Sequence, residues 1–254
     1  MSTVVVEVGS LGAGVATVTL NDPERRNALF PETVAGLIEA FEQLDNDKEV
    51  GAVVITGTNP AFCAGGSLDD LERLQSAADA HAIYEGFLRV ARSPLPTIAA
   101  VNGAAVGAGL NLALCCDVRL ASPEARFESR FMPLGLHPGG GHSWMLRQVV
   151  GPQHAAAMLL FNSVVRGEEA ERIGLVWRCV PGPELLEAAG AMAGQAASYP
   201  HDLVRKTKQT LNTMASVDAH SEAVELEVEA QLWSVNQPDF RSRIASLQAQ
   251  IRGR

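Results

Sequence analysis

Cysteine is scarce in this chain, and no two cysteines have the Cys-x-x-Cys spacing of a zinc or redox site. The four are Cys63, Cys115, Cys116 and Cys179. We expect them to be reduced and mostly buried thiols. His137 and His142 are separated by glycines and lack a cysteine or carboxylate at ligand spacing. The sequence therefore predicts a protein without a metal site.

Basic residues are also few, with 20 Lys and Arg against 29 Asp and Glu and a formal net charge of −9. This balance argues against nucleic acid as a partner. An anionic small ligand can still bind where a few cationic side chains and backbone N–H groups outweigh the global field. The first ten residues lack the basic segment of a secretory signal, and Glu7 interrupts their apolar stretch. We therefore expect a cytoplasmic protein.

Charged residues are absent between Arg92 and Asp117, a stretch long enough to cross a membrane. It includes Gly-x-x-x-Gly at Gly103 and Gly107, a pattern typical of paired transmembrane helices. Two prolines near its start and two asparagines within it argue against a span. The pattern also changes midway from strand-like TIAAV to helix-like GAGLNLALCC. We predict a buried strand, a glycine turn and a buried helix, and no membrane span.

Strand-like and helix-like segments alternate along most of the chain. TVVVEV and GVATVTLN predict an antiparallel hairpin, a helix follows from Pro31, and VGAVVITG is apolar enough for a buried strand. This alternation indicates an α/β fold with mostly parallel strands. From Pro183 the pattern is entirely helical. We expect a core over residues 1–195 and a helical extension over residues 196–254 that packs on another subunit.

Two glycine-rich turns each follow a predicted buried strand and lead into a helix. They are AFCAGGSL, residues 61–68, and the turn around Gly107. Glycine lets a substrate oxygen approach the backbone, and the first N–H groups of a helix lack partners within it. Two such turns on neighbouring strands could direct two N–H groups at one oxygen, as in an oxyanion hole. Ordinary tight turns are the alternative.

One motif suggests a different chemistry. GHSWM, Gly141–Met145, matches the nucleophile elbow of serine hydrolases except at its fifth position, where Met145 replaces glycine. A serine hydrolase that uses Ser143 is therefore an alternative. GAGLNL has Leu112 where a dinucleotide-binding turn needs its third glycine, so that fingerprint is not met.

Five motifs together resemble the crotonase superfamily, the enoyl-CoA hydratase/isomerase family. They are PERRNAL, AFCAGGSL, AAVNGAAVGAGLNLALCCDVRLAS, ARF…LGLHPGGG and GEEAERIGLV, in the family's order and spacing as far as about Asn212. The resemblance implies a crotonase-like β/β/α spiral core with a helical C-terminal extension for trimerisation. It also implies a homotrimer or dimer of trimers, and an acyl-CoA thioester as ligand. Coenzyme A would enter as part of the substrate, with no separate cofactor.

The resemblance implies roles for particular residues. The amides of Gly66 and Ala108 would form the oxyanion hole, in which the thioester carbonyl becomes an enolate. The residues that would bind the substrate are Arg25, Arg26, Ala64, Gly65, Leu68, Gly107 and Lys208.

The chain departs from the family's hydratases at two positions. Those enzymes use two glutamates, and Asn111 and Phe131 stand in their places. Hydration needs groups that exchange protons, and neither replacement does so usefully. We therefore expect thioester activation to be retained and ordinary enoyl-CoA hydration to be weak or absent. A non-catalytic fatty acyl-CoA-binding protein is the alternative.

A different ionisable group could have replaced the glutamate pair. The candidates are His137, Glu128, His142 and Asp69, and Arg130 could hold a substrate carboxylate or shift a neighbour's pKa. A surface or subunit-interface ion pair is the alternative for Glu128 and Arg130. Double-bond migration, which one base can perform, needs less than hydration does.

Overall fold

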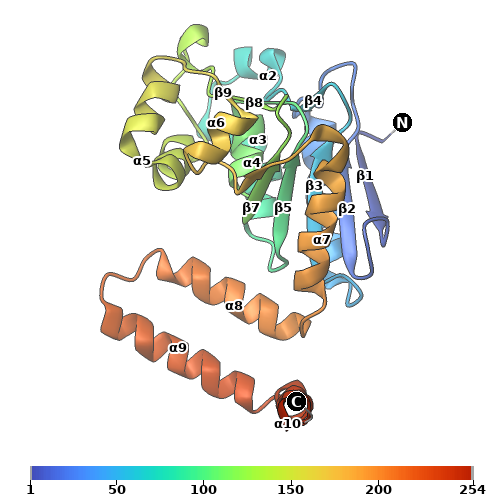
Figure 1. Cartoon of the computed structure of the whole chain (residues 1–254). Helices are drawn as coiled ribbons and strands as arrows, with labels where there is room; N and C mark the ends of the chain where they lie inside the picture. The colour runs from blue at the N-terminus through green and yellow to red at the C-terminus, as the bar shows by residue number, and fades with distance from the viewer. Residues whose placement is uncertain (1, 253–254) are drawn as a thin grey trace. The chain divides into compact units, whose positions relative to one another are not determined.

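The computed structural model describes residues 2–252, and the chain falls into two compact units, Met1–Ala197 and Ser198–Arg254. The first unit contains all the strands described below (Figure 1). The second consists of α8 (His201–Met214), α9 (His220–Val235) and α10 (Pro238–Arg252). The trimerisation role expected for residues 196–254 stays a prediction.

A six-stranded sheet forms the centre of the first unit, with strand order β1-β2-β3-β5-β7-β10. Its strands are β1 (Val4–Val8), β2 (Val15–Leu20), β3 (Ala52–Gly57), β5 (Thr97–Val101), β7 (Val118–Ala121) and β10 (Arg178–Cys179). The first two pair antiparallel as the predicted hairpin, and every other neighbouring pair is parallel. The expected α/β fold with mostly parallel strands is confirmed.

A second, four-stranded sheet has the order β4-β6-β8-β9. Its strands are β4 (Ala61–Cys63), β6 (Ala104–Val106), β8 (Arg126–Glu128) and β9 (Val165–Arg166). β4, β6 and β8 are parallel, and β9 is antiparallel to β8. The sequence pattern did not predict β4, β6 or β9, since two or three residues are too few to establish a period of two. Both glycine turns therefore follow strands of this second sheet, a correction to the expected layout.

Helices cover both faces of the large sheet. α7 (Leu185–Ala197) lies along one face (Figure 1), where Leu185, Ala189 and Ala193 pack against inward residues such as Val54 and Ile98. The other face packs on the main core. The helices of the first unit are α1 (Pro31–Asn46), α2 (Leu68–Glu72), α3 (Ala77–Ala91), α4 (Ala108–Leu114), α5 (His142–Leu160) and α6 (Gly167–Arg172), with short 3₁₀ turns at Met132–Leu134 and Gly182–Glu184.

The alternation along β3 explains why its sequence is continuously apolar. Val53 and Ile55 belong to the main core, whereas Ala52 and Val54 face the α7 side. A strand covered by helices on both faces has no solvent side to mark with polar residues. The uncharged stretch before Asp117 is buried in the same way, as β5, β6 and α4. Among residues 2–252, no helix has both the length and the apolarity to cross a bilayer.

α5 contains a break between two helical segments. Gly151 has φ +75°, outside the helical range, and Pro152 follows it. Proline is tolerated in the first turn of a helix, so the second helical segment can begin at Pro152. The first segment begins at His142, directly after Gly140 and Gly141, which both have positive φ. The start of α5 thus fixes the position of His142, which belongs to the site described below.

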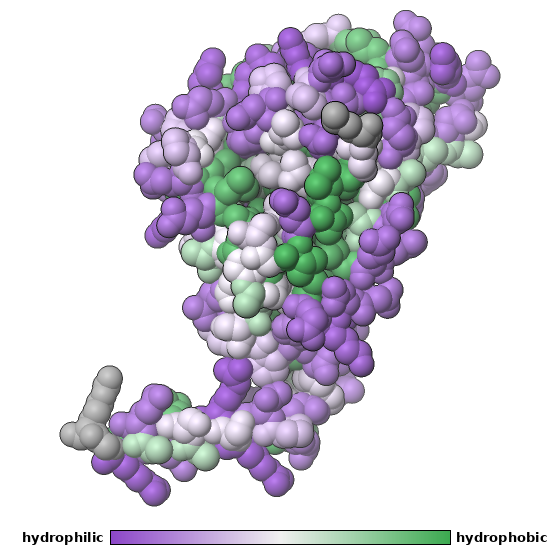
Figure 2. All heavy atoms as spheres, turned by 90° about the vertical axis from the view of Figure 1, so that its right-hand side faces the viewer, coloured by the Kyte–Doolittle hydropathy of each residue, from purple (hydrophilic) through white to green (hydrophobic). Residues whose placement is uncertain are grey.

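The edge of the large sheet is partly apolar. β1 has only one neighbour, and its Val6 and Val8 are 37% and 52% exposed. Figure 2, which faces the side where β1 lies in Figure 1, shows apolar residues grouped within a hydrophilic surround.

The cysteines are free, and burial raises the pKa of both Cys63 and Cys115 to about 12. These two thiols are therefore protonated and unreactive at neutral pH.

Candidate active site

A cavity of about 480 Å³ lies in the first unit where three parallel strands end. Ala64–Ser67 follow β4, Gly107 and Ala108 follow β6, and Ser129–Phe131 follow β8, and residues of all three segments line the cavity. The carboxyl ends of parallel strands are the usual position for ligand sites in α/β folds. The short second sheet thus brings together segments that are far apart in the sequence.

The two glycine turns pack directly on each other. Gly65 has φ +100°, and a Cβ built on it would lie 2.6 Å from the Val106 carbonyl oxygen and 3.6 Å from the Ala108 nitrogen. A Cβ on Gly109 would overlap the carbonyl oxygen of Cys63. Only glycine allows backbones to approach so closely. The two predicted turns therefore form one structure.

Hydrogen bonds hold both turns in place. Leu29 donates its N–H to the Gly65 carbonyl at 2.7 Å, and Gly107 donates its N–H to the Glu128 carbonyl at 2.9 Å. Among the hydrogen bonds of residues 2–252, neither the Gly66 N–H nor the Ala108 N–H has an acceptor. Both residues line the cavity, so two backbone donors on neighbouring turns are left for a ligand.

Beside these donors, three buried side chains form a hydrogen-bonded chain. Asn111 donates from Nδ2 to the Gly139 carbonyl at 3.0 Å, and its Oδ1 lies 2.5 Å from His142 Nδ1. His142 Nε2 lies 2.9 Å from Ser129 Oγ. All three residues are at most 2% exposed. Burial lowers the pKa of His142 to about 4, so its imidazole is neutral at neutral pH.

Phe131 completes this side of the cavity. Its ring packs edge to face on the His142 ring, with centroids 4.9 Å apart. The two positions where the resemblance expects glutamates, Asn111 and Phe131, therefore both contact His142. The sequence suggested His142 among four ionisable candidates and did not suggest Ser129. The sequence feature that could have indicated Ser129 is a hydroxyl two residues before Phe131, after the same strand.

The other ionisable candidates have different surroundings. His137 is exposed at the cavity and donates from Nδ1 to the Pro138 carbonyl at 2.8 Å. Asp69 also lines the cavity. Glu128 is 5% exposed and accepts two hydrogen bonds from Arg130 at 2.7 and 2.8 Å, with Arg126 3.6 Å away. The ion pair that the sequence left open for Glu128 and Arg130 is therefore present within this chain.

The residues expected to bind substrate are only partly brought together. Arg25 lines the cavity, where Asp22 and Glu32 bind its guanidinium at 2.6 and 2.8 Å. Arg26 is exposed, and it is not among the described residues that line the cavity. Lys208 lies on α8 in the second unit, so its contact with a ligand stays a prediction. The remaining expected contacts all line the cavity: Ala64, Gly65, Leu68 and Gly107.

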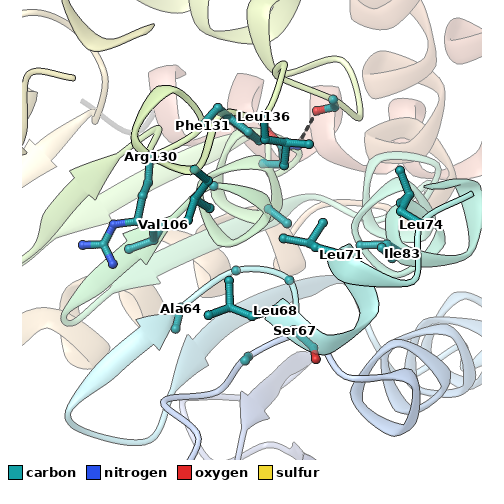
Figure 3. Close-up of a pocket in the computed structure, with 18 of the residues that line it drawn as sticks. Ala64, Ser67, Leu68, Leu71, Leu74, Ile83, Val106, Arg130, Phe131 and Leu136 are labelled. Carbon is teal, nitrogen blue, oxygen red and sulfur yellow. Dashed lines mark hydrogen bonds between the residues drawn. The ribbon is translucent and has the colours of Figure 1, made fainter. Parts of the chain in front are cut away.

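The far end of the cavity is apolar. Figure 3 shows Leu71, Leu74 and Ile83 at the end opposite Arg130, with Phe131 and Leu136 across from Leu68. A chamber of leucine and isoleucine side chains favours a hydrocarbon ligand, because burial of apolar surface stabilises the complex. The site thus joins backbone hydrogen-bond donors to an apolar chamber.

Two sheets, the smaller of which carries interlocking glycine turns at its strand ends, and a helical C-terminal region define a crotonase-type α/β protein. A family model described as enoyl-CoA hydratase/isomerase matches residues 10–249, and the chain belongs to this family. The matched range includes every residue of the cavity.

Individual relatives agree with this assignment. "Probable enoyl-CoA hydratase EchA14" of Mycobacterium tuberculosis is 45% identical over 247 residues, which cover 94% of this chain and 96% of the relative. The 1,2-epoxyphenylacetyl-CoA isomerase of Escherichia coli is 33% identical over 243 residues, 93% of this chain and 92% of that protein. The crystal structure of enoyl-CoA hydratase from Bacillus anthracis superimposes with a TM-score of 0.90 at 27% identity, covering 99% and 97% of the two chains.

Proposed function

We propose that this protein is an acyl-CoA-processing enzyme whose Gly66 and Ala108 amides polarise a thioester carbonyl. Two observations carry the proposal: the two glycine turns contact each other, and among residues 2–252 the Gly66 and Ala108 N–H groups at this cavity have no acceptor. Donors fixed before the reaction stabilise the developing negative charge of an enolate without reorganisation. Coenzyme A takes part as a portion of the substrate.

The apolar chamber supports a fatty acyl group as the rest of that substrate. Leu71, Leu74 and Ile83 line the cavity and offer no polar atom to a substituted or sugar-like ligand. Ordinary hydration of an enoyl-CoA is expected to be weak, because Asn111 and Phe131 cannot exchange protons with water. Each lost acid or base group costs roughly 10²- to 10⁴-fold in rate.

A second candidate is a carrier that binds fatty acyl-CoA without transforming it. Phe131 favours this alternative, since its ring adds apolar surface to the cavity in place of an acid. Turnover of crotonyl-CoA, a 3-enoyl-CoA and a long-chain acyl-CoA, measured beside binding calorimetry, separates the two. Product from the 3-enoyl-CoA would support the enzyme, and tight binding without product from any substrate would support the carrier.

We also propose that the C-terminal helices join subunits into a trimer or a dimer of trimers. On α10, Phe240, Ile244, Leu247 and Ile251 recur at spacings of three and four and are 39–65% exposed. In multi-angle light scattering, we expect the wild type to have three or six times the chain mass. Ile244→Glu with Leu247→Glu should lower that mass, whereas Ser246→Glu on the same helix should not. A monomeric wild type would contradict this proposal.

A further inference from the structure

The hydrogen-bonded chain beside the two amides has a defined direction. Because Asn111 Nδ2 donates to the Gly139 carbonyl, Oδ1 is the atom that faces His142 Nδ1. Nδ1 therefore carries the imidazole proton, and the lone pair of Nε2 is left to accept from Ser129 Oγ–H at 2.9 Å. This is the tautomer in which a histidine can take a proton from a serine.

From this geometry we infer a further activity: Ser129 is a nucleophile that accepts the acyl group of a bound thioester, with His142 as its general base. Asn111 is the positioning residue that fixes the His142 tautomer. A nucleophile within hydrogen-bond reach of a base, which a third group orients, is the arrangement that activates serine. The inference rests on the acyl-CoA binding of the proposed function, but it does not require an enolate.

The position of Ser129 in the fold places this residue next to the turn that carries the Ala108 amide. β6 and β8 are paired at Val106 and Glu128, so Ala108 and Ser129 follow neighbouring strand ends. A Cβ built on Gly107 would lie 3.6 Å from the Ser129 carbonyl oxygen. Ser129 and both amide residues line the same cavity. The two N–H groups that would hold an enolate oxygen would equally hold the oxyanion of a tetrahedral intermediate.

The reaction balances with water as the second substrate. Ser129 Oγ bonds to the thioester carbon while its proton moves to His142 Nε2. The carbon–sulfur bond then breaks, and the thiolate of coenzyme A takes that proton. Water attacks the resulting serine ester, gives a proton to His142, and the proton returns to Oγ as the acid leaves. The net change is hydrolysis of an acyl-CoA to a carboxylic acid and free coenzyme A.

The hydrogen bonds from Ser129 through His142 to Asn111 also explain why an amide can serve here in place of a carboxylate. In serine triads, replacement of aspartate by asparagine costs about 10⁴-fold where the amide imposes the wrong histidine tautomer. Here the Gly139 carbonyl binds the amide NH₂ and prevents that exchange. An uncharged Asn111 still leaves the imidazolium without a counter-charge, so we expect slow hydrolysis that a carboxylate at this position would accelerate.

The test uses the full chain with octanoyl-CoA, following release of free thiol and the mass of the intact protein. We expect thiol release above the buffer rate, and peptide mapping should place any acyl adduct on Ser129. Ser129→Ala should reduce release at least about 100-fold. Ser163→Ala is the matched control, because Ser163 is exposed, lies outside the cavity lining and should leave release unchanged. Ser129→Cys should restore acylation, as a thioester.

Two further variants test the base and its positioning residue. His142→Gln should abolish release while the protein still binds a non-hydrolysable octyl-CoA thioether in calorimetry. Asn111→Ala should lower the acylation rate without weakening that binding, and Asn111→Asp should raise the rate above wild type. Thermal melting of each variant shows whether it is folded. A purely structural role for Asn111 predicts no gain from aspartate.

The outcomes separate this inference from the proposed function. If the thioether binds but thiol release stays at the buffer rate and no adduct forms, the nucleophilic role of Ser129 is overturned alone. Equal release from wild type and a folded Ser129→Ala variant would overturn it as well. If neither octanoyl-CoA nor the thioether binds, both proposals fail.

Discussion

The cavity has two sides that are built from different parts of the chain. One side is made of backbone, where the turns at Gly65 and Gly107 present the N–H groups of Gly66 and Ala108. The other side is made of side chains, where Asn111 and Phe131 line the cavity and both contact the buried His142. A backbone donor exists whatever the residue type, provided the turn keeps its shape. Side chains can be exchanged without changing the fold, so this side is where family members can differ in chemistry.

The largest effect should come from removing one backbone donor without disturbing its turn. Ala108 is the first residue of α4, and proline fits that position because its φ suits the first helical turn. Ala108→Pro deletes the N–H, and we expect turnover of the best acyl-CoA substrate to fall roughly 10²- to 10³-fold. Ala108→Gly, which keeps the N–H, should retain most of the activity. Equal rates for the two variants would break the distinction between the two sides.

On the side of the cavity made of side chains, His142 should make the free energy of unfolding depend on pH. The folded chain lowers the pKa of His142 from its ordinary value of 6.5 to about 4 through burial. The unfolded chain therefore binds more protons between pH 6.5 and pH 4, and the free energy of unfolding should fall as pH decreases through that window. The full loss is on the order of 3 kcal/mol. Denaturant unfolding at several pH values measures it.

His142→Gln provides the comparison for this pH dependence. The variant cannot titrate, so the difference in unfolding free energy between wild type and variant should narrow as pH falls from 6.5 to 4. Other groups titrate in both proteins and cancel in the difference. A constant difference across the window would show that His142 is not the buried neutral imidazole described here.

The backbone side of the cavity depends on close contact between the two turns, and two glycines can test this: Gly66 in the first turn and Gly109 in α4, directly after the second. A Cβ on Gly109 would overlap the Cys63 carbonyl, whereas a Cβ on Gly66 would meet only Ile83 Cγ2 at 3.7 Å and Leu71 Cγ at 4.0 Å. Gly109→Ala should therefore lower the free energy of unfolding by roughly 1–3 kcal/mol, as overpacked sites do, and weaken acyl-CoA binding. Gly66→Ala should be nearly neutral in urea unfolding. Comparable losses in both variants would contradict the interlocked arrangement of the turns.

The two sides of the cavity also differ in how well the sequence predicts them. The glycine turns could be predicted because AFCAGGSL and the segment around Gly107 are contiguous and each leads into a helix. Their contact needed β4 and β6, which are three residues each and too short to show a period. The chain Ser129–His142–Asn111 combines a strand end, the start of α5 and the middle of α4. No local pattern reports such a contact, since it depends on the packing of three separate elements.

The smallest effect should come from His137, a histidine that lines the cavity. His137 is exposed and its Nδ1 is bound to the neighbouring Pro138 carbonyl, so it has neither a buried partner nor a third group to orient it. We expect His137→Ala to change turnover by less than about 10-fold, below the 10²- to 10⁴-fold that a general acid or base contributes. His142→Gln, assayed on the same substrate, gives the scale for this comparison. A greater loss from His137→Ala would move the proton-transfer chemistry from the buried side of the cavity to its exposed rim, and Ser129 would then need a different base.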